Sequence, residues 1–208
     1  MVSPLNVAYR IDSTDCITTV SEGWTSFAMA NGGKDLLPPG ILGTSLWPWI
    51  VDPTTRQVYR SLLTRVRKGA DAVRFQFRCD GPDRRRLLQM QITLAADDNV
   101  DFQTTLLRDQ PRAEVDLMDP VTIRSDALLT ICGWCMRVPV SGKWLEIEGA
   151  VSALGLLEAS TMPHLSHGMC PACYNTMLTA IDDPTLSASV QVSVAALPDE
   201  VSTRSQRC

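Results

Sequence analysis

The sequence predicts an α+β protein, in which an antiparallel sheet with helices on one face precedes a small α+β module that binds a metal through cysteines. Three observations support this prediction. Residues 73–78, 88–94 and 100–106 alternate apolar with polar side chains, a period that gives a sheet one buried and one solvated face. A segment with the apolar stripe of a helix precedes them. Two C-x2-C pairs follow them.

The composition is that of a globular protein. The 208 residues suit one large domain or two small ones, with 45% apolar and 20% charged residues. A net charge of −4 favours neither nucleic acid nor an acidic membrane surface as a partner. We find no signal peptide and no apolar run long enough to span a membrane. We therefore expect a cytoplasmic protein, in which cysteines stay reduced.

The first elements are short. Residues 7–11 and 17–20 are predicted to be strands, because turn-forming residues separate two apolar runs. A short helix is expected over residues 24–30, with Ser21 as its N-cap, because a serine oxygen can accept from the free backbone amides of the first turn.

A longer helix is the clearest single element. Asp52 can cap it and Pro53 fits its first turn, whereas Gly69 ends it. The three alternating strands that follow have short, turn-rich connections, which predicts an antiparallel meander. The basic run Arg84–Arg86 is assigned to one of these turns, as a solvated loop tip or, alternatively, a contact for an anionic partner.

The order of these elements resembles a PAS domain, the sensory module of bacterial signalling proteins. The stretches 20–33, 41–69 and 74–94 carry the resemblance. It implies a homodimer that senses a small-molecule ligand or a partner. Aromatic side chains could line a ligand pocket, although such residues more often fill a core. The main candidates are Trp24, Phe27, Trp47, Phe75 and Phe77, and Trp49 and Phe102 belong to the same group.

Four cysteines form the strongest functional pattern. Cys132 and Cys135 are one C-x2-C pair, Cys170 and Cys173 are another, and residues 136–169 separate them. Each pair can direct two thiolates at one point, and four thiolates suit a structural zinc ion. An iron-bound or redox-active version is the alternative, and disulfides or free thiols are a further one.

The sequence around the cysteines adds detail. Residues 144–159 have helix-like apolar spacing, and a metal would supply stability that so small a module lacks. The amino-acid sequence of residues 131–135 and 166–173 resembles a cysteine-rich segment found beside PAS domains and in bacterial sensor kinases. His167 is expected to support the site from outside the ligand set; direct ligation by His167 is the alternative.

No nucleotide-binding loop or nucleophile motif is recognisable. We therefore expect a non-enzymatic sensor that acts on another signalling protein, with a thiol or metal redox sensor as the alternative. The expected organisation is a PAS-like domain, a linker, a cysteine module and a partly disordered C-terminal extension. Their ranges are 5–110, 111–127, 128–180 and 181–208.

Overall fold

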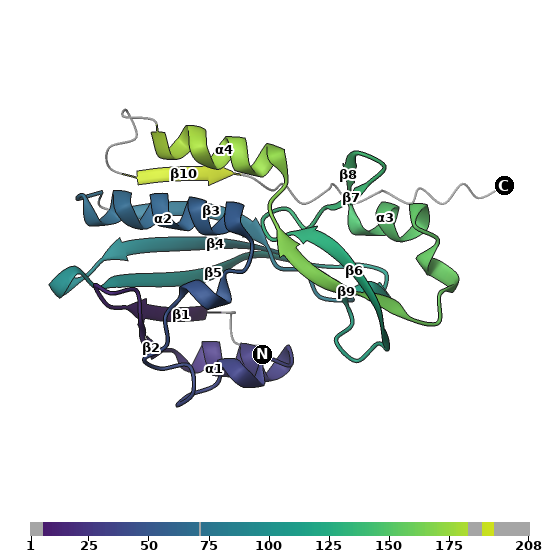
Figure 1. The fold of residues 1–208 in the computed structure, drawn as a ribbon, viewed down its shortest axis with the longest axis horizontal. Helices are drawn as coiled ribbons and strands as arrows, with labels where there is room; N and C mark the ends of the chain where they lie inside the picture. The colour runs from purple at the N-terminus through teal and green to yellow at the C-terminus, as the bar shows by residue number, and fades with distance from the viewer. Residues whose placement is uncertain (1–5, 71, 183–188, 194–208) are drawn as a thin grey trace.

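The computed structural model describes residues 6–70, 72–182 and 189–193, and it confirms an α+β fold (Figure 1). Its largest sheet has the strand order β10-β3-β4-β5-β1-β2. Five of these strands form an antiparallel array: β1 (Asn6–Ile11), β2 (Ile17–Val20), β3 (Ala72–Arg78), β4 (Arg84–Leu94) and β5 (Val100–Pro111). The predicted meander is therefore confirmed.

The predicted helix starts are also confirmed. Helix α1 (Glu22–Ala30) is capped by Ser21, whose hydroxyl accepts from the Trp24 amide. Asp52 caps α2 (Pro53–Arg67) by accepting from the Thr55 amide at 2.7 Å. Gly69 then takes a positive φ of 101°, a conformation that suits glycine after a helix end.

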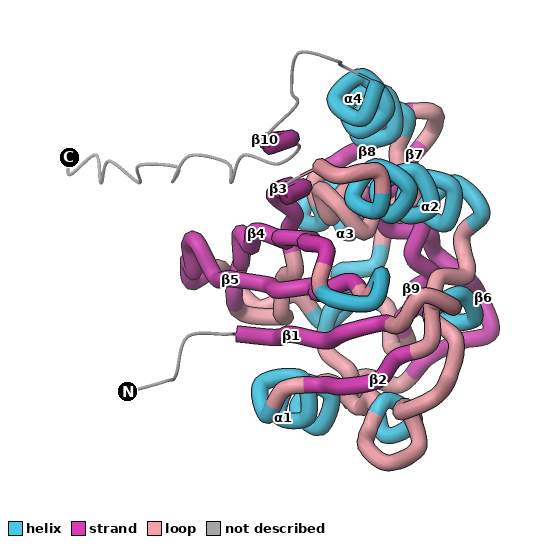
Figure 2. The backbone as a smooth tube through the Cα atoms, turned by 90° about the vertical axis from the view of Figure 1, so that its left-hand side faces the viewer, coloured by secondary structure: helices cyan, strands magenta, loops and turns pink. Residues whose placement is uncertain are grey.

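The main core lies between α2 and the sheet. The apolar stripe of α2, including Val58 and Leu62, packs against the face that carries Phe75 and Phe102. Helix α1 adds Trp24, whose ring contacts Tyr9 at a centroid distance of 5.3 Å. Helix α4 (Pro171–Asp182) lies beside α2 (Figures 1 and 2).

The second part of the chain has its own small core. Strands β6 (Arg124–Cys132) and β9 (Met162–Gly168) pair in parallel, and β7 (Val138–Val140) pairs with β8 (Lys143–Leu145). Helix α3 (Ile147–Ala153) packs against them. The buried members of this core are Val115, Leu117, Ile131, Met136, Val138, Ile147, Ala150, Val151 and Met162.

Two local predictions are wrong. The helix expected over 144–159 is divided: Trp144 lies in β8, α3 begins at Ile147, and Gly155 ends it with a φ of 66°. Arg84–Arg86 is no loop tip, because these residues open β4 and pair with the end of β5. The turn between β3 and β4 lies just before them.

The segments outside the two predicted domains contribute to the fold. The stretch 111–127 contains a one-turn helix, and its Leu117 is fully buried. The extension expected at 181–208 supplies the end of α4 and the strand β10 (Ser189–Ser193), which pairs in parallel with β3. The predicted disorder at 183–188 and 194–208 lies outside the described residues.

Short 3-10 helices complete the connections: η1 (Lys34–Leu36), η2 (Trp47–Trp49), η3 (Ala96–Asp98), η4 (Asp116–Met118) and η5 (Leu156–Glu158). Among the described residues, no helix has the length and apolar character needed to cross a membrane.

Candidate metal centre

Two parallel strands bring the cysteine pairs together. Cys132 is the last residue of β6, and Cys170 follows the end of β9. Because β6 and β9 run side by side in the same direction, both end at one edge, where the Gly133 amide donates to the Gly168 carbonyl at 2.9 Å. Cys173 lies in the first turn of α4. Pairing of β6 with β9 thus brings together two cysteine pairs that lie far apart in the sequence.

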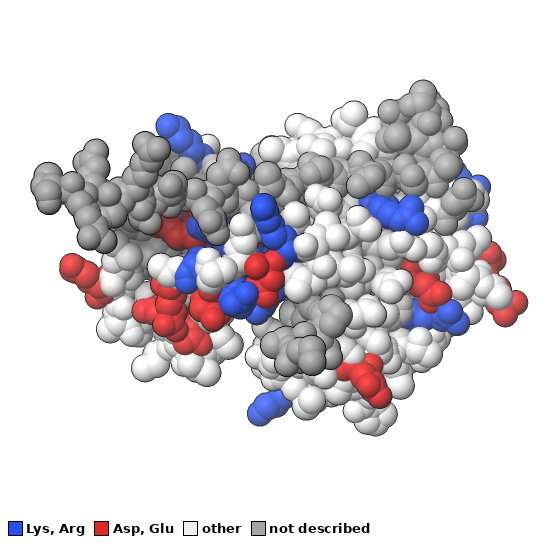
Figure 3. Space-filling model, turned by 180° about the vertical axis from the view of Figure 1, so that it is seen from behind, with Lys and Arg blue, Asp and Glu red and all other residues white. Residues whose placement is uncertain are grey.

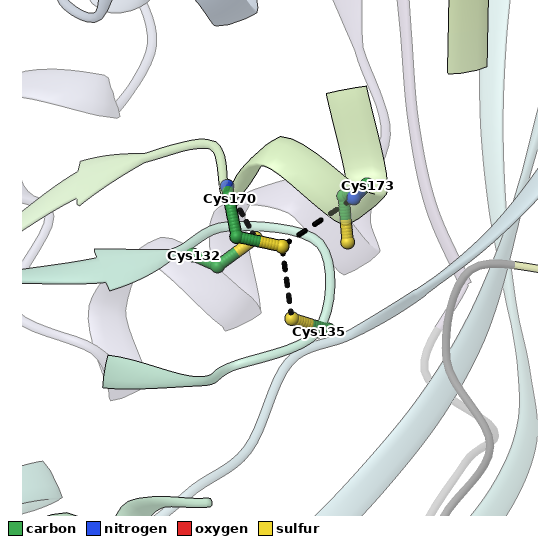
Figure 4. A group of neighbouring side chains, drawn as sticks. All are labelled: Cys132, Cys135, Cys170 and Cys173. Carbon is green, nitrogen blue, oxygen red and sulfur yellow. Dashed lines mark hydrogen bonds between the residues drawn. The ribbon is translucent and has the colours of Figure 1, made fainter. Parts of the chain in front are cut away.

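The four sulfur atoms converge (Figure 4). All lie within 4.8 Å of one another, and the Cys135 and Cys170 Sγ atoms are 3.8 Å apart. Backbone amides point at the sulfurs, since the Cys170 amide donates to Cys132 Sγ and the Cys173 amide to Cys170 Sγ, both at 3.4 Å. Each of the four residues is at most 5% exposed.

The surroundings favour the anionic form of Cys132, whereas the neighbouring sulfurs and burial raise the pKa of Cys135 and Cys173. Hydrogen bonds from the Cys135, Cys170 and Cys173 thiols, with the Cys170 amide, lower the pKa of Cys132 despite its burial. Buried thiolates that share one point need a cation to offset their repulsion. The donor set therefore fits a metal ion that takes four soft ligands. Among the described residues, this is the one such group of potential ligands.

The cysteines belong to the main core rather than to that of the second part. They cluster with Met177 and Ile181 of α4 and with the α2 side of the sheet. The Arg65 guanidinium on α2 donates to the Ile181 carbonyl, which fastens α4 to α2. The site was expected to replace a missing core in a separate module. Instead, the cysteines pack in the main core, whereas their neighbours Ile131 and Met136 belong to the core of the second part.

Charged side chains join the same two parts. Arg78, only 2% exposed, contacts Asp80 and reaches Glu146 Oε2 at 2.5 Å. Arg85 reaches Glu148 at 2.6 Å. Viewed from behind, acidic and basic side chains lie close together near the middle of the molecule (Figure 3).

The charges and the backbone tie the sheet to both α3 and the cysteine turn. Arg112 contacts Asp80 and Glu148, each at 3.4 Å. Burial disfavours ionised Glu148, but a hydrogen bond to its own backbone amide and the Arg85 guanidinium lower the pKa of its carboxyl. The Arg78 amide also donates to the Trp134 carbonyl, inside the first cysteine pair, at 2.8 Å.

The predicted binding residues have different positions. His167, on β9, and His164 lie outside the four-sulfur group. A cleft of about 500 Å³ among the described residues has none of the five main aromatic candidates in its wall, although Trp49, from the same predicted group, does line it. Phe75 is buried in the core, and Trp47 lines a smaller hollow beside Arg60.

Sequence reasoning missed several residues at the junction. Arg78 was assigned to the solvated sheet face by its alternation with Phe75 and Phe77, and the second part of the chain covers it instead. The sequence contained one signal for this junction: basic residues at the end of β3 and the start of β4, and the two acidic residues Glu146 and Glu148. Their pairing could not be inferred without the packing.

No model of a known protein family matches this chain, and no curated protein sequence matches it either.

Proposed function

We propose that this chain is a non-enzymatic sensor protein, in which the PAS-like sheet domain senses a ligand or partner and a zinc-stabilised cysteine module relays the response. The observation that carries the proposal is the group of four buried sulfurs on the core shared by both parts. A change on the sheet side would reach the module through this contact and through the charged junction.

The sulfur geometry fits zinc, which we propose as the metal, with iron bound by the same four sulfurs as the alternative. Four Zn–S bonds of about 2.3 Å in a tetrahedron give sulfur–sulfur distances near 3.8 Å. The Cys135–Cys170 distance is 3.8 Å and the others stay within 4.8 Å. Four sulfurs complete the coordination of zinc and leave no position for a substrate, which favours a structural role over a catalytic one.

The charged junction supports a relay. The Arg78 and Asp80 side chains are at most 1% exposed, so a displacement of either one would leave a buried charge without its partner. Glu146, at the start of α3, accepts from Arg78 and from Arg137. A shift of β3 would therefore move α3 and the first cysteine turn together.

The alternative is a redox sensor that releases its metal on oxidation. Burial of the sulfurs disfavours it, because oxidants react with exposed thiolates. A homodimer in the cytoplasm that docks on another signalling protein completes the proposal, as the resemblance to PAS domains implies.

Elemental analysis with native mass spectrometry tests the proposal. We expect about one zinc ion per chain, retained under mild peroxide, and a dimeric mass. Cys132→Ser should lose the zinc, whereas Cys79→Ser, which changes a cysteine outside the group, should keep it. Absence of zinc from the purified protein, or its loss under mild peroxide, would contradict the structural site.

A further inference from the structure

The main cleft lies beside the metal centre. Its walls come from β1, the start of α2, the first cysteine turn and the end of β9. Gly133 and Trp134, which lie between Cys132 and Cys135, and Gly168, two residues before Cys170, also line it. Its volume of about 500 Å³ suits a small molecule.

Four aromatic residues line the cleft: Tyr9, Trp49, Tyr59 and Trp134. The Tyr59 and Trp134 ring centroids are 5.9 Å apart at an interplanar angle of 61°, so the two rings form a corner. Ring faces at such a corner attract cations through their quadrupoles. The aromatic wall therefore favours an apolar body with a positive group.

The charges that line the cleft also favour a positively charged ligand group. Asp52 is the one carboxylate among the described residues that line it, and none of these is a lysine or an arginine. Tyr59 adds no charge, because burial raises the pKa of its phenol to about 12, still further above neutral pH. Arg56, one turn along α2, donates instead to the carbonyls of Trp47 and Ile50.

One carboxylate oxygen of Asp52 accepts a hydrogen bond from a described residue, and the other does not. Oδ2 accepts from the Thr55 amide as the cap of α2. Oδ1 faces Gly168, where an added Cβ would lie 3.8 Å from it. No described residue donates a hydrogen bond to Oδ1. It can therefore pair with a cation in the cleft.

We propose that this cleft binds a small organic amine, with its ammonium group at Asp52 and its apolar body against Tyr59 and Trp134. This assigns a ligand class to the proposed sensor, and its role in signalling rests on that proposal. Because Trp134 lies between Cys132 and Cys135, the occupant would touch the metal module and the sheet domain at once.

Three probes that share one phenylethyl body test the charge: phenethylamine, 2-phenylethanol and phenylacetate. We would titrate each into the zinc-loaded full chain by calorimetry at pH 7.5. We expect phenethylamine to bind about tenfold more tightly than the alcohol, because the ammonium adds cation–π and carboxylate contacts. Phenylacetate should be the weakest, since its charge repels Asp52.

Asp52→Asn keeps the helix cap and removes the charge. We expect it to abolish the preference for the amine over the alcohol, whereas Asp35→Asn, at an exposed position outside the cleft, should preserve it. Zinc content and thermal melting of each variant confirm that it is folded. Indole ¹⁵N spectra locate the probe: the Trp49 and Trp134 signals should move, and those of Trp24 and Trp144 should not.

Equal binding of amine and alcohol, an unchanged preference in Asp52→Asn, or no binding of any probe would overturn the proposal. Movement of the Trp24 or Trp144 signals alone would do the same, because it would place the probe elsewhere. Each of these results leaves the zinc content untouched, so failure of the amine site is distinguishable from failure of the metal centre.

Discussion

Arg78, whose side chain is 1% exposed, is one of the deeply buried charges of the junction. Its guanidinium contacts Asp80, which is fully buried, and Glu146. Burial lowers the pKa of Arg78, yet its pKa is raised overall because hydrogen bonds and charge attraction from the two carboxylates outweigh burial. A buried ion pair of this kind adds little to the free energy of unfolding compared with an apolar pair of the same shape. Removal of one partner is costly, however, because the other charge stays buried and unpaired.

We expect Arg78→Met to destabilise the protein by about 3 kcal/mol, because it removes the closest partner of the Asp80 carboxylate. Arg84→Met is the matched control. It breaks the pair between Arg84 and Asp109, whose side chains are 37% and 30% exposed, and should cost less than about 1 kcal/mol. Urea unfolding measures both. Equal losses in the free energy of unfolding would show that the buried pair contributes no more to stability than the exposed one.

Helix α3 shows how a short element is fixed at its end. Gly149 lies within it, exposed, and a Cβ there would meet no heavy atom closer than 4.0 Å. Gly155 follows it with a φ of 66°, in open space. The two positions differ in backbone conformation and not in crowding.

Alanine at the two positions should therefore act in opposite directions. Gly149→Ala should stabilise the protein by about 0.5–1 kcal/mol, because alanine loses less backbone entropy in a helix. Gly155→Ala should destabilise it by about 1 kcal/mol, because an L-residue is strained at that φ. Thermal unfolding of both variants checks this, and a shift of the same sign in both would refute the reason given.

At the scale of the whole molecule, the cysteines connect elements from both halves of the chain. Their cluster includes residues of the sheet, α2 and α4, whereas the second core has none of them. A metal ion there would stabilise the contact between the halves as well as the two turns. The charged junction adjoins the same contact, since the Arg78 amide donates to the Trp134 carbonyl inside the first cysteine pair.

Removal of the proposed zinc ion with a chelator should thus lower the thermal midpoint of the protein. A ligand at about a thousand times its dissociation constant contributes ~4 kcal/mol, which corresponds to about 10 °C for a chain of this size. Amide exchange should accelerate in α4 and the first cysteine turn more than in β4 and β5. Faster exchange confined to the second core would contradict the shared position of the site.

Local signals in the sequence determined most elements of the first half. Asp52, Pro53 and Gly69 define the ends of α2 because caps and breakers act on adjacent backbone. Alternation determined the meander because side chains on successive strand residues face opposite ways. The C-x2-C spacing identified the four cysteines that come together, since each pair needs only one tight turn.

Only the tertiary structure decided how these parts meet. Nothing local to β6 and β9 requires their parallel pairing, which places the two cysteine turns together. Burial of Arg78, pairing of β10 with β3, and the cleft beside Trp134 also depend on contacts between segments distant in sequence. Such contacts are set by the summed packing of many residues, which no single window of the sequence contains.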